Sequence, residues 1–122
     1  GYYVISDRFH DSSTAYQGFG RGLSVDAILN IHNLAIGETI PDITFFIDIP
    51  NNIAIDRKRN IAHSDLDRIE VSDNTFYERV REGYLYLSKK EKRFKVIDGT
   101  QSINQINVQI INEIKLLESV NK

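Results

Sequence analysis

Asp7 and Arg8 stand where a short apolar run gives way to polar sequence, and the pair could bind a phosphate group. The planar guanidinium of arginine presents parallel N–H donors that match two phosphate oxygens. The neighbouring carboxylate could hold a magnesium-bound water or orient the arginine. A lone Asp-Arg pair at a strand end is more often a simple ion-paired terminus, so its neighbours must decide between the two interpretations.

Hydroxyl, aromatic and amide side chains follow within a few residues of Arg8, and all of them could contact the same ligand. They are Ser12, Ser13, Tyr16 and Gln17. If a helix begins in this segment, Ser13 and Tyr16 lie on the same face of it, because they are three positions apart. A phosphate-binding arginine beside a ring and an amide predicts a pocket for a nucleoside monophosphate.

These side chains need a scaffold, and the sequence predicts alternating strands and helices. Apolar and β-branched runs predict strands at 2–5, 43–49 and 94–97. Apolar residues at helical spacing predict helices over 24–36, from 51 or 52 to about 60, from about 73, and from 102. The result is an α/β fold, a parallel sheet with flanking helices, in which ligands bind at the carboxyl ends of the strands.

Several details of these elements can be predicted from local signals. Ser24 and Gly37 should bound the helix over 24–36, while Ser102 and Gln105 have the spacing of a capping box. The run at 2–5 predicts a buried strand, and the run at 43–49 is apolar on nearly both faces, which is typical of a central strand. The buried stripe predicted for the last helix is Ile103, Ile106, Ile110, Ile114 and Leu117.

Length and composition exclude several classes of protein. The 122 residues, of which 41% are hydrophobic and 26% charged, suit one globular domain. A net charge of −2 argues against a nucleic-acid-binding protein, since phosphate neutralisation needs a basic surplus. The absence of cysteine removes disulfides, thiolate nucleophiles and sulfur-ligated zinc. The absence of cysteine is also compatible with a cytoplasmic setting, which we expect. The apolar runs are far shorter than the ~20 residues of a membrane span, so we expect no membrane partner.

The segment 7–23, which reads DRFHDSSTAYQGFGRGL, resembles the DR(Y/F)xxSSxAYQGxGRGL signature of bacterial thymidylate kinases. Later landmarks appear in the same order as in that family, namely PDIT at 41–44, DRIE at 67–70, FYERVREGY at 76–84 and VIDGT at 96–100. The resemblance implies one partial nucleoside-monophosphate-kinase domain over 1–122, with a lid at about 57–70.

The resemblance also implies the reaction and the roles of the first block. Members of the family transfer the γ-phosphoryl group of ATP to dTMP, giving dTDP, with Mg²⁺. Arg8 would then grip the dTMP phosphate, and Asp7 would help to organise the metal ion indirectly. Ser13 and Gln17 match positions at the thymine. Tyr16 matches a ring that occupies the place of a ribose 2′-hydroxyl, which favours deoxy substrates.

In the lid, Arg57 and Arg59 match arginines that reach the transferring phosphoryl group, where such a residue can raise the rate about 10³-fold or more. Asp67 and Glu70 match lid carboxylates that serve the metal shell. For either arginine alone, a solvated helix end explains the charge equally well. Arg68 and Glu70 could likewise form an ordinary exposed ion pair.

One family motif is absent, because the sequence contains no G-x-x-x-x-G-K-[ST] phosphate loop. We therefore expect this chain to correspond to the C-terminal portion of a P-loop kinase, without the N-terminal strand, loop and helix. We also expect the chain to be inactive alone. The resemblance further implies a homodimer. Two other readings stay open: a related deoxynucleoside kinase, and a non-catalytic or degenerate fragment that acts only in an assembly. Arg21 could contact a phosphate or pin the glycine loop, and Asp98-Gly99-Thr100 could touch adenine or simply form a tight turn.

Overall fold

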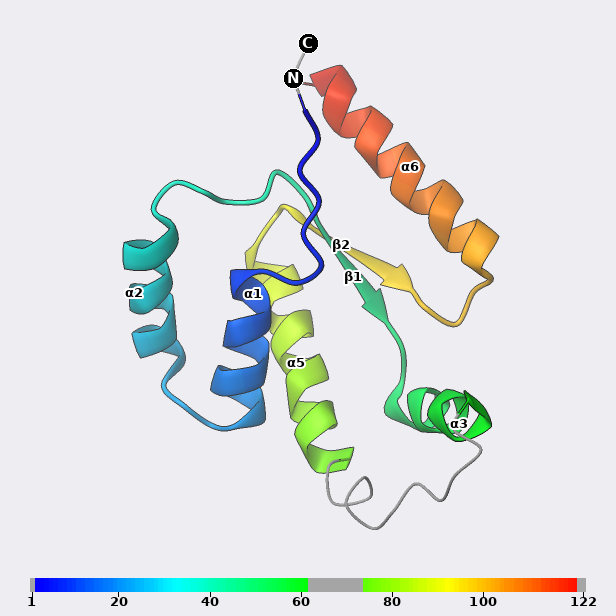
Figure 1. Cartoon of the computed structure of the whole chain (residues 1–122), viewed down its shortest axis with the longest axis horizontal. Helices are drawn as coiled ribbons and strands as arrows, with labels where there is room; N and C mark the ends of the chain where they lie inside the picture. Colours follow the sequence, from blue (N-terminus) through cyan, green and yellow to red (C-terminus); the bar gives the residue numbers. More distant parts are fainter. Residues whose placement is uncertain (1, 62–73, 121–122) are drawn as a thin grey trace.

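A parallel pair of strands with helices around it forms the framework of the molecule (Figure 1). The computed structural model describes residues 2–61 and 74–120. In chain order the elements are α1 (His10–Ser13), the π-helix η1 (Thr14–Gly20), α2 (Val25–Ile36), β1 (Thr44–Asp48), α3 (Asn51–Ile61), α5 (Asn74–Lys90), β2 (Phe94–Asp98) and α6 (Ile103–Val120). No helix in these residues is both long and apolar enough to cross a membrane.

The sheet confirms the predicted parallel arrangement of the strands at 43–49 and 94–97. β1 and β2 run side by side, and their register pairs Thr44 with Phe94 and Asp48 with Asp98. The two carboxyl ends therefore lie together, as expected for an α/β fold. In the part of the chain that the structure describes, β2 is the only strand that pairs with β1, so the prediction of a central strand is wrong for these residues.

The predicted buried strand at 2–5 is also wrong, because this segment has no strand conformation in the structure. Its side chains are exposed, from 73% for Tyr3 to 100% for Tyr2. The composition suits a strand, but strand structure requires hydrogen bonds to a neighbouring backbone. No described residue pairs with this segment, which runs as an extended trace at the N-terminal end of the chain (Figure 1).

The best-packed contact lies between α5 and η1, which run against each other in Figure 1. Val80 and Leu87 of α5 are buried, as is Ala15 of η1. Close approach requires a glycine at position 83, where an added Cβ would lie only 2.9 Å from the ring of Phe19. The apolar face predicted for the helix beginning near residue 73 is confirmed, and this packing fixes α5 against the segment that follows Arg8.

The predicted helix ends are confirmed where local chemistry sets them. At the start of α2, the backbone N–H of Ala27 donates to Ser24 Oγ, and Gly37 ends the helix with a φ of +55°. At α6, the N–H of Gln105 donates to Ser102 Oγ at 3.3 Å, and the N–H of Ser102 donates to Gln105 Oε1 at 3.0 Å. These reciprocal bonds are a capping box.

The buried stripe predicted for α6 is wrong, since none of the residues of this helix is buried. Ile103 is 85% exposed, and the other members of the stripe are half-buried. Among the described elements α6 packs mainly on β2, from which it extends at an angle (Figure 1). Helical spacing identifies an apolar face correctly, but burial depends on whether another element covers that face.

A buried ion pair ties α1 to the sheet. The two terminal nitrogens of Arg93 donate to the two carboxylate oxygens of Asp11, each at 2.7 Å, and Nη1 also donates to Thr44 Oγ1. Both charged side chains are about nine-tenths buried. His10 lies against this pair, with its Nε2 3.4 Å from an Asp11 oxygen. Residues 10–14 are thereby held against the start of both strands.

We expect the pH dependence of stability to depend on His10. Burial lowers the pKa of His10 below its ordinary value of 6.5; Asp11 raises this pKa and Arg93 and His32 lower it, with burial the largest influence. The unfolded chain therefore binds this proton more readily, so the free energy of unfolding falls as the pH drops from about 6.5 toward the lowered pKa. Urea denaturation at several pH values gives the free energy of unfolding as a function of pH. Below about pH 6.5 this free energy should change less steeply with pH for His10→Gln than for the parent chain. The same steepness in both proteins would contradict this assignment.

Candidate functional site

Arg8 lies in an unusual backbone conformation immediately before α1. Its φ is +69°, in the left-handed region that few non-glycine residues adopt. The hydroxyl of Ser6 donates to the carbonyl oxygen of Arg8 at 2.9 Å and closes a tight turn around it. Such conformations persist where the surroundings enforce them, and they concentrate at functional sites. The turn ends the N-terminal trace and carries the chain into the helix that bears the other candidate residues.

The structure brings Arg8 together with Ser12 and Tyr16. The guanidinium carbon lies 4.3 Å from the centroid of the Tyr16 ring, and Arg8 Nε donates to Ser12 Oγ at 3.4 Å. Ser12 and Tyr16 face the arginine together, because they are four positions apart on the continuous α1–η1 helix. Among the described residues, no group accepts a hydrogen bond from the Nη nitrogens of Arg8. These donors are therefore available to a ligand.

Tyr84, the last residue of the FYERVREGY segment at 76–84, also belongs to this cluster. Its hydroxyl oxygen lies 2.6 Å from Ser12 Oγ, and its ring stacks on Phe46 with centroids 4.8 Å apart. Burial raises the pKa of Tyr84, and the hydrogen bond to Ser12 opposes this only in part. A tyrosine at a core position is itself a signal, because its hydroxyl needs a polar partner.

Other predicted residues of the first block are exposed beside the cluster. Asp7, Ser13 and Gln17 all have solvent-accessible side chains, and in the described structure none of them hydrogen-bonds to Arg8. Arg21 is also exposed, with its guanidinium carbon 5.9 Å from the centre of the Phe76 ring. The roles predicted for these residues stay predictions.

The predicted lid residues fall mostly outside the described part of the chain. Arg57 lies on α3 with an exposed side chain. The side chain of Arg59 and all of Asp67, Arg68 and Glu70 lie outside the described residues.

At the end of β2, the structure supports the tight-turn interpretation of Asp98-Gly99-Thr100. The N–H and hydroxyl of Thr100 both donate to Asp98 Oδ1, at 2.8 and 2.6 Å. These bonds, the hydroxyl's first, lower the pKa of Asp98. The Asp98 carboxylate thus already accepts hydrogen bonds from within the turn that it forms.

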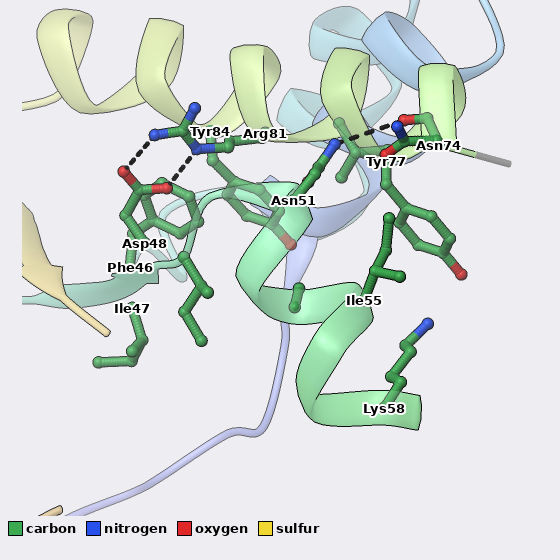
Figure 2. A pocket seen from close by; sticks show the side chains of 13 residues that line it. Phe46, Ile47, Asp48, Asn51, Ile55, Lys58, Asn74, Tyr77, Arg81 and Tyr84 are labelled. Carbon is green, nitrogen blue, oxygen red and sulfur yellow. Dashed lines mark hydrogen bonds and ion pairs between the residues drawn. The ribbon is translucent and has the colours of Figure 1, made fainter. Parts of the chain in front are cut away.

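A cavity of about 430 Å³ lies between β1, α3 and α5 (Figure 2). Its lining is mostly apolar, with Phe46 and Tyr84 on one wall and Ile55 on α3. At the carboxyl end of β1, Arg81 closes a two-bond ion pair with Asp48, with N···O distances of 2.6 and 2.8 Å. Tyr84 therefore belongs both to this cavity and to the cluster around Arg8.

The described residues do not build a metal centre by themselves. Across 2–61 and 74–120, no three His, Asp or Glu side chains converge on one point. Magnesium is commonly held by one or two carboxylates together with substrate phosphates and water. The exposed Asp7, next to an arginine whose Nη nitrogens meet no acceptor within 2–61 and 74–120, fits that mode of binding.

Comparison with known proteins places these residues in one family. A family model described as thymidylate kinase matches residues 1–110. The chain is 44% identical over 115 residues to the thymidylate kinase of Kosmotoga olearia, covering 93% of this chain and 54% of that protein. With the thymidylate kinase of Lactobacillus acidophilus the identity is 41% over 116 residues, covering 94% and 54% of the two chains.

A solved structure agrees with the sequence relatives. The crystal structure of thymidylate kinase from Ehrlichia chaffeensis superposes with a TM-score of 0.64 at 32% identity, covering 88% of this chain and 46% of that chain. The chain thus spans about half the length of the relatives that it matches.

Proposed function

The chain belongs to the thymidylate kinase family, and from that premise we propose that it carries the acceptor side of an enzyme that phosphorylates dTMP. In this reaction an oxygen of the dTMP phosphate attacks the γ-phosphorus of ATP. The bond between that phosphorus and the β,γ-bridging oxygen breaks, and ADP leaves with the electron pair. The products are dTDP and ADP.

The arrangement of Arg8, Ser12 and Tyr16 is the observation that carries the proposal. The unused Nη donors of Arg8 match two oxygens of a phosphate, which would hold the acceptor in place. The Tyr16 ring, against which the guanidinium stacks, would lie beside the sugar and leave no room or partner for a 2′-hydroxyl. Ser13 and Gln17, both exposed on the same short helical segment, are proposed to contact the thymine.

Magnesium and the lid belong to the same proposal. When bound with the nucleotides, Mg²⁺ would supply positive charge that offsets the negative charge developing during transfer. Asp7 would hold a water molecule of that ion, next to the arginine that binds the acceptor. We assign the lid over ATP to residues 57–70, with Arg57 and Arg59 donating to the transferring group, Asp67 and Glu70 serving the metal shell and Arg68 adding positive charge.

The donor side needs groups that this sequence does not contain. No G-x-x-x-x-G-K-[ST] motif occurs in the 122 residues, so neither a phosphate-cradling loop nor its lysine is available for ATP. We therefore propose that this chain binds dTMP but does not turn over alone. Homodimerisation and a cytoplasmic location are part of the same proposal, carried by family membership.

Titrating the chain with dTMP and with thymidine, while following ADP release in the presence of ATP and Mg²⁺, tests this function. We expect dTMP to bind more tightly than thymidine and ADP release to stay at background. Equal binding of the two ligands would favour a deoxynucleoside kinase, and binding of neither would favour a non-catalytic chain. Turnover comparable to that of a full-length thymidylate kinase would refute the assignment of the donor side.

A further inference from the structure

We propose that Tyr84 is a positioning residue for Arg8, which it orients through the hydroxyl of Ser12. Arg8 and Ser12 lie at the start of α1, whereas Tyr84 lies on α5, so the contact joins segments that are far apart in the sequence. Because Tyr84 acts through the arginine that would meet the acceptor phosphate, this role rests on the proposed function.

Two hydrogen bonds of the Ser12 hydroxyl form a continuous link from Tyr84 to Arg8. Ser12 Oγ lies 2.6 Å from Tyr84 Oη and accepts from Arg8 Nε at 3.4 Å. A serine hydroxyl has one hydrogen and two lone pairs. It can therefore accept a hydrogen bond from the arginine and also form one with the tyrosine hydroxyl, as donor or as acceptor. Ser12 is only 8% exposed, so solvent has little access to replace either partner.

The ring of Tyr84 is itself held in place by the sheet. It stacks on Phe46 of β1 with an interplanar angle of 15°, and α5 packs closely against η1. Val80 and Leu87, on the same face of α5, have apolar side chains that are buried in the core. A hydroxyl at the Tyr84 position adds nothing to that packing, and burying it is unfavourable unless it has a partner. That partner is Ser12, which in turn contacts the arginine.

The consequence is a preorganised guanidinium. With Nε bonded to Ser12 and the guanidinium carbon held 4.3 Å from the centre of the Tyr16 ring, the two Nη groups are confined to a defined direction. A ligand phosphate then binds without first ordering a flexible side chain, which would otherwise reduce affinity. Loss of the Tyr84 hydroxyl should therefore weaken binding of ligands with a phosphate and leave the nucleoside part of recognition unaffected.

The test compares Tyr84→Phe with Tyr86→Phe, a control that removes the same atom from the same helix. Tyr86 packs against Phe19 and Lys90, away from the arginine. We expect Tyr84→Phe to weaken dTMP binding about three- to tenfold, as expected for loss of one hydrogen bond, and to leave thymidine binding unchanged. Tyr86→Phe should change neither. An equal loss for dTMP and thymidine, or no loss at all, would overturn the role.

A second readout does not depend on ligand binding. The Nε–H resonance of Arg8, identified by its loss in Arg8→Ala, should shift and exchange faster with water in Tyr84→Phe but not in Tyr86→Phe. If the parent chain bound no dTMP, the proposed function would fail, and this resonance would still decide whether the link exists. A resonance unchanged in Tyr84→Phe would overturn the link, whatever the titrations show.

Discussion

Replacing Arg8 with alanine is expected to weaken dTMP binding by about 1.5–3 kcal/mol, the range for hydrogen bonds that involve a charged group. The reason is that the Nη donors of Arg8 have no acceptor among the described protein groups, so that both Nη nitrogens can donate to oxygens of the ligand phosphate. Thymidine has no phosphate, so its affinity should hardly change. Calorimetric titration of both ligands with both proteins measures the difference directly.

Two further variants separate the effect of the planar guanidinium from the effect of positive charge alone on dTMP binding. Arg8→Lys keeps the positive charge but loses the planar fork, so we expect an affinity for dTMP between those of the parent chain and the alanine variant. Lys89→Ala removes an exposed positive charge near the end of α5 and should leave binding unchanged. If Lys89→Ala weakened dTMP binding as much as Arg8→Ala, general electrostatic attraction would replace the proposed phosphate contact.

The second large effect is expected on stability, from the ion pair that joins α1 to the sheet. Arg93→Ala would leave the buried carboxylate of Asp11 without its partner, and breaking a buried pair in this way typically costs about 3–5 kcal/mol. Urea denaturation at neutral pH should therefore show a much lower transition midpoint. Because residues 10–14 rest on this pair, the variant should also disturb the segment that carries Ser12.

A matched control for this prediction lies two residues along the chain. Lys95 pairs with Glu113 at 2.9 Å, but both side chains are substantially exposed, so Lys95→Ala should cost no more than about 1 kcal/mol. Both variants remove one cation from a paired carboxylate, Arg93→Ala just before β2 and Lys95→Ala within it, and the two pairs differ in burial. Equal destabilisation by the two variants would show that the Asp11 carboxylate finds water or another partner when Arg93 is removed.

Features with local causes could be predicted from the sequence. The caps at Ser24 and Ser102 involve groups only three residues apart, and both are present. The common face of Ser12 and Tyr16 has the same origin, because residues four positions apart on a helix lie on one side of it. The parallel pairing of β1 and β2 follows from alternation of strands and helices along the chain.

Features that depend on distant partners could not be predicted in this way. The link from Ser12 to Tyr84 spans 72 positions and the pair of Asp11 with Arg93 spans 82, and neither leaves a periodic signal in the sequence. The apolar composition of 2–5 indicates a strand, yet composition does not supply the neighbouring backbone that a strand requires. For α6, the apolar spacing is real, but no described element covers that face.

The most direct test is a crystal structure of the chain with dTMP bound. We expect the Nη nitrogens of Arg8 to lie about 2.7–3.2 Å from phosphate oxygens, with the Tyr16 ring against the deoxyribose. A phosphate bound elsewhere, for example near Lys58 in the cavity beside α3, with Arg8 directed away from it, would contradict the account.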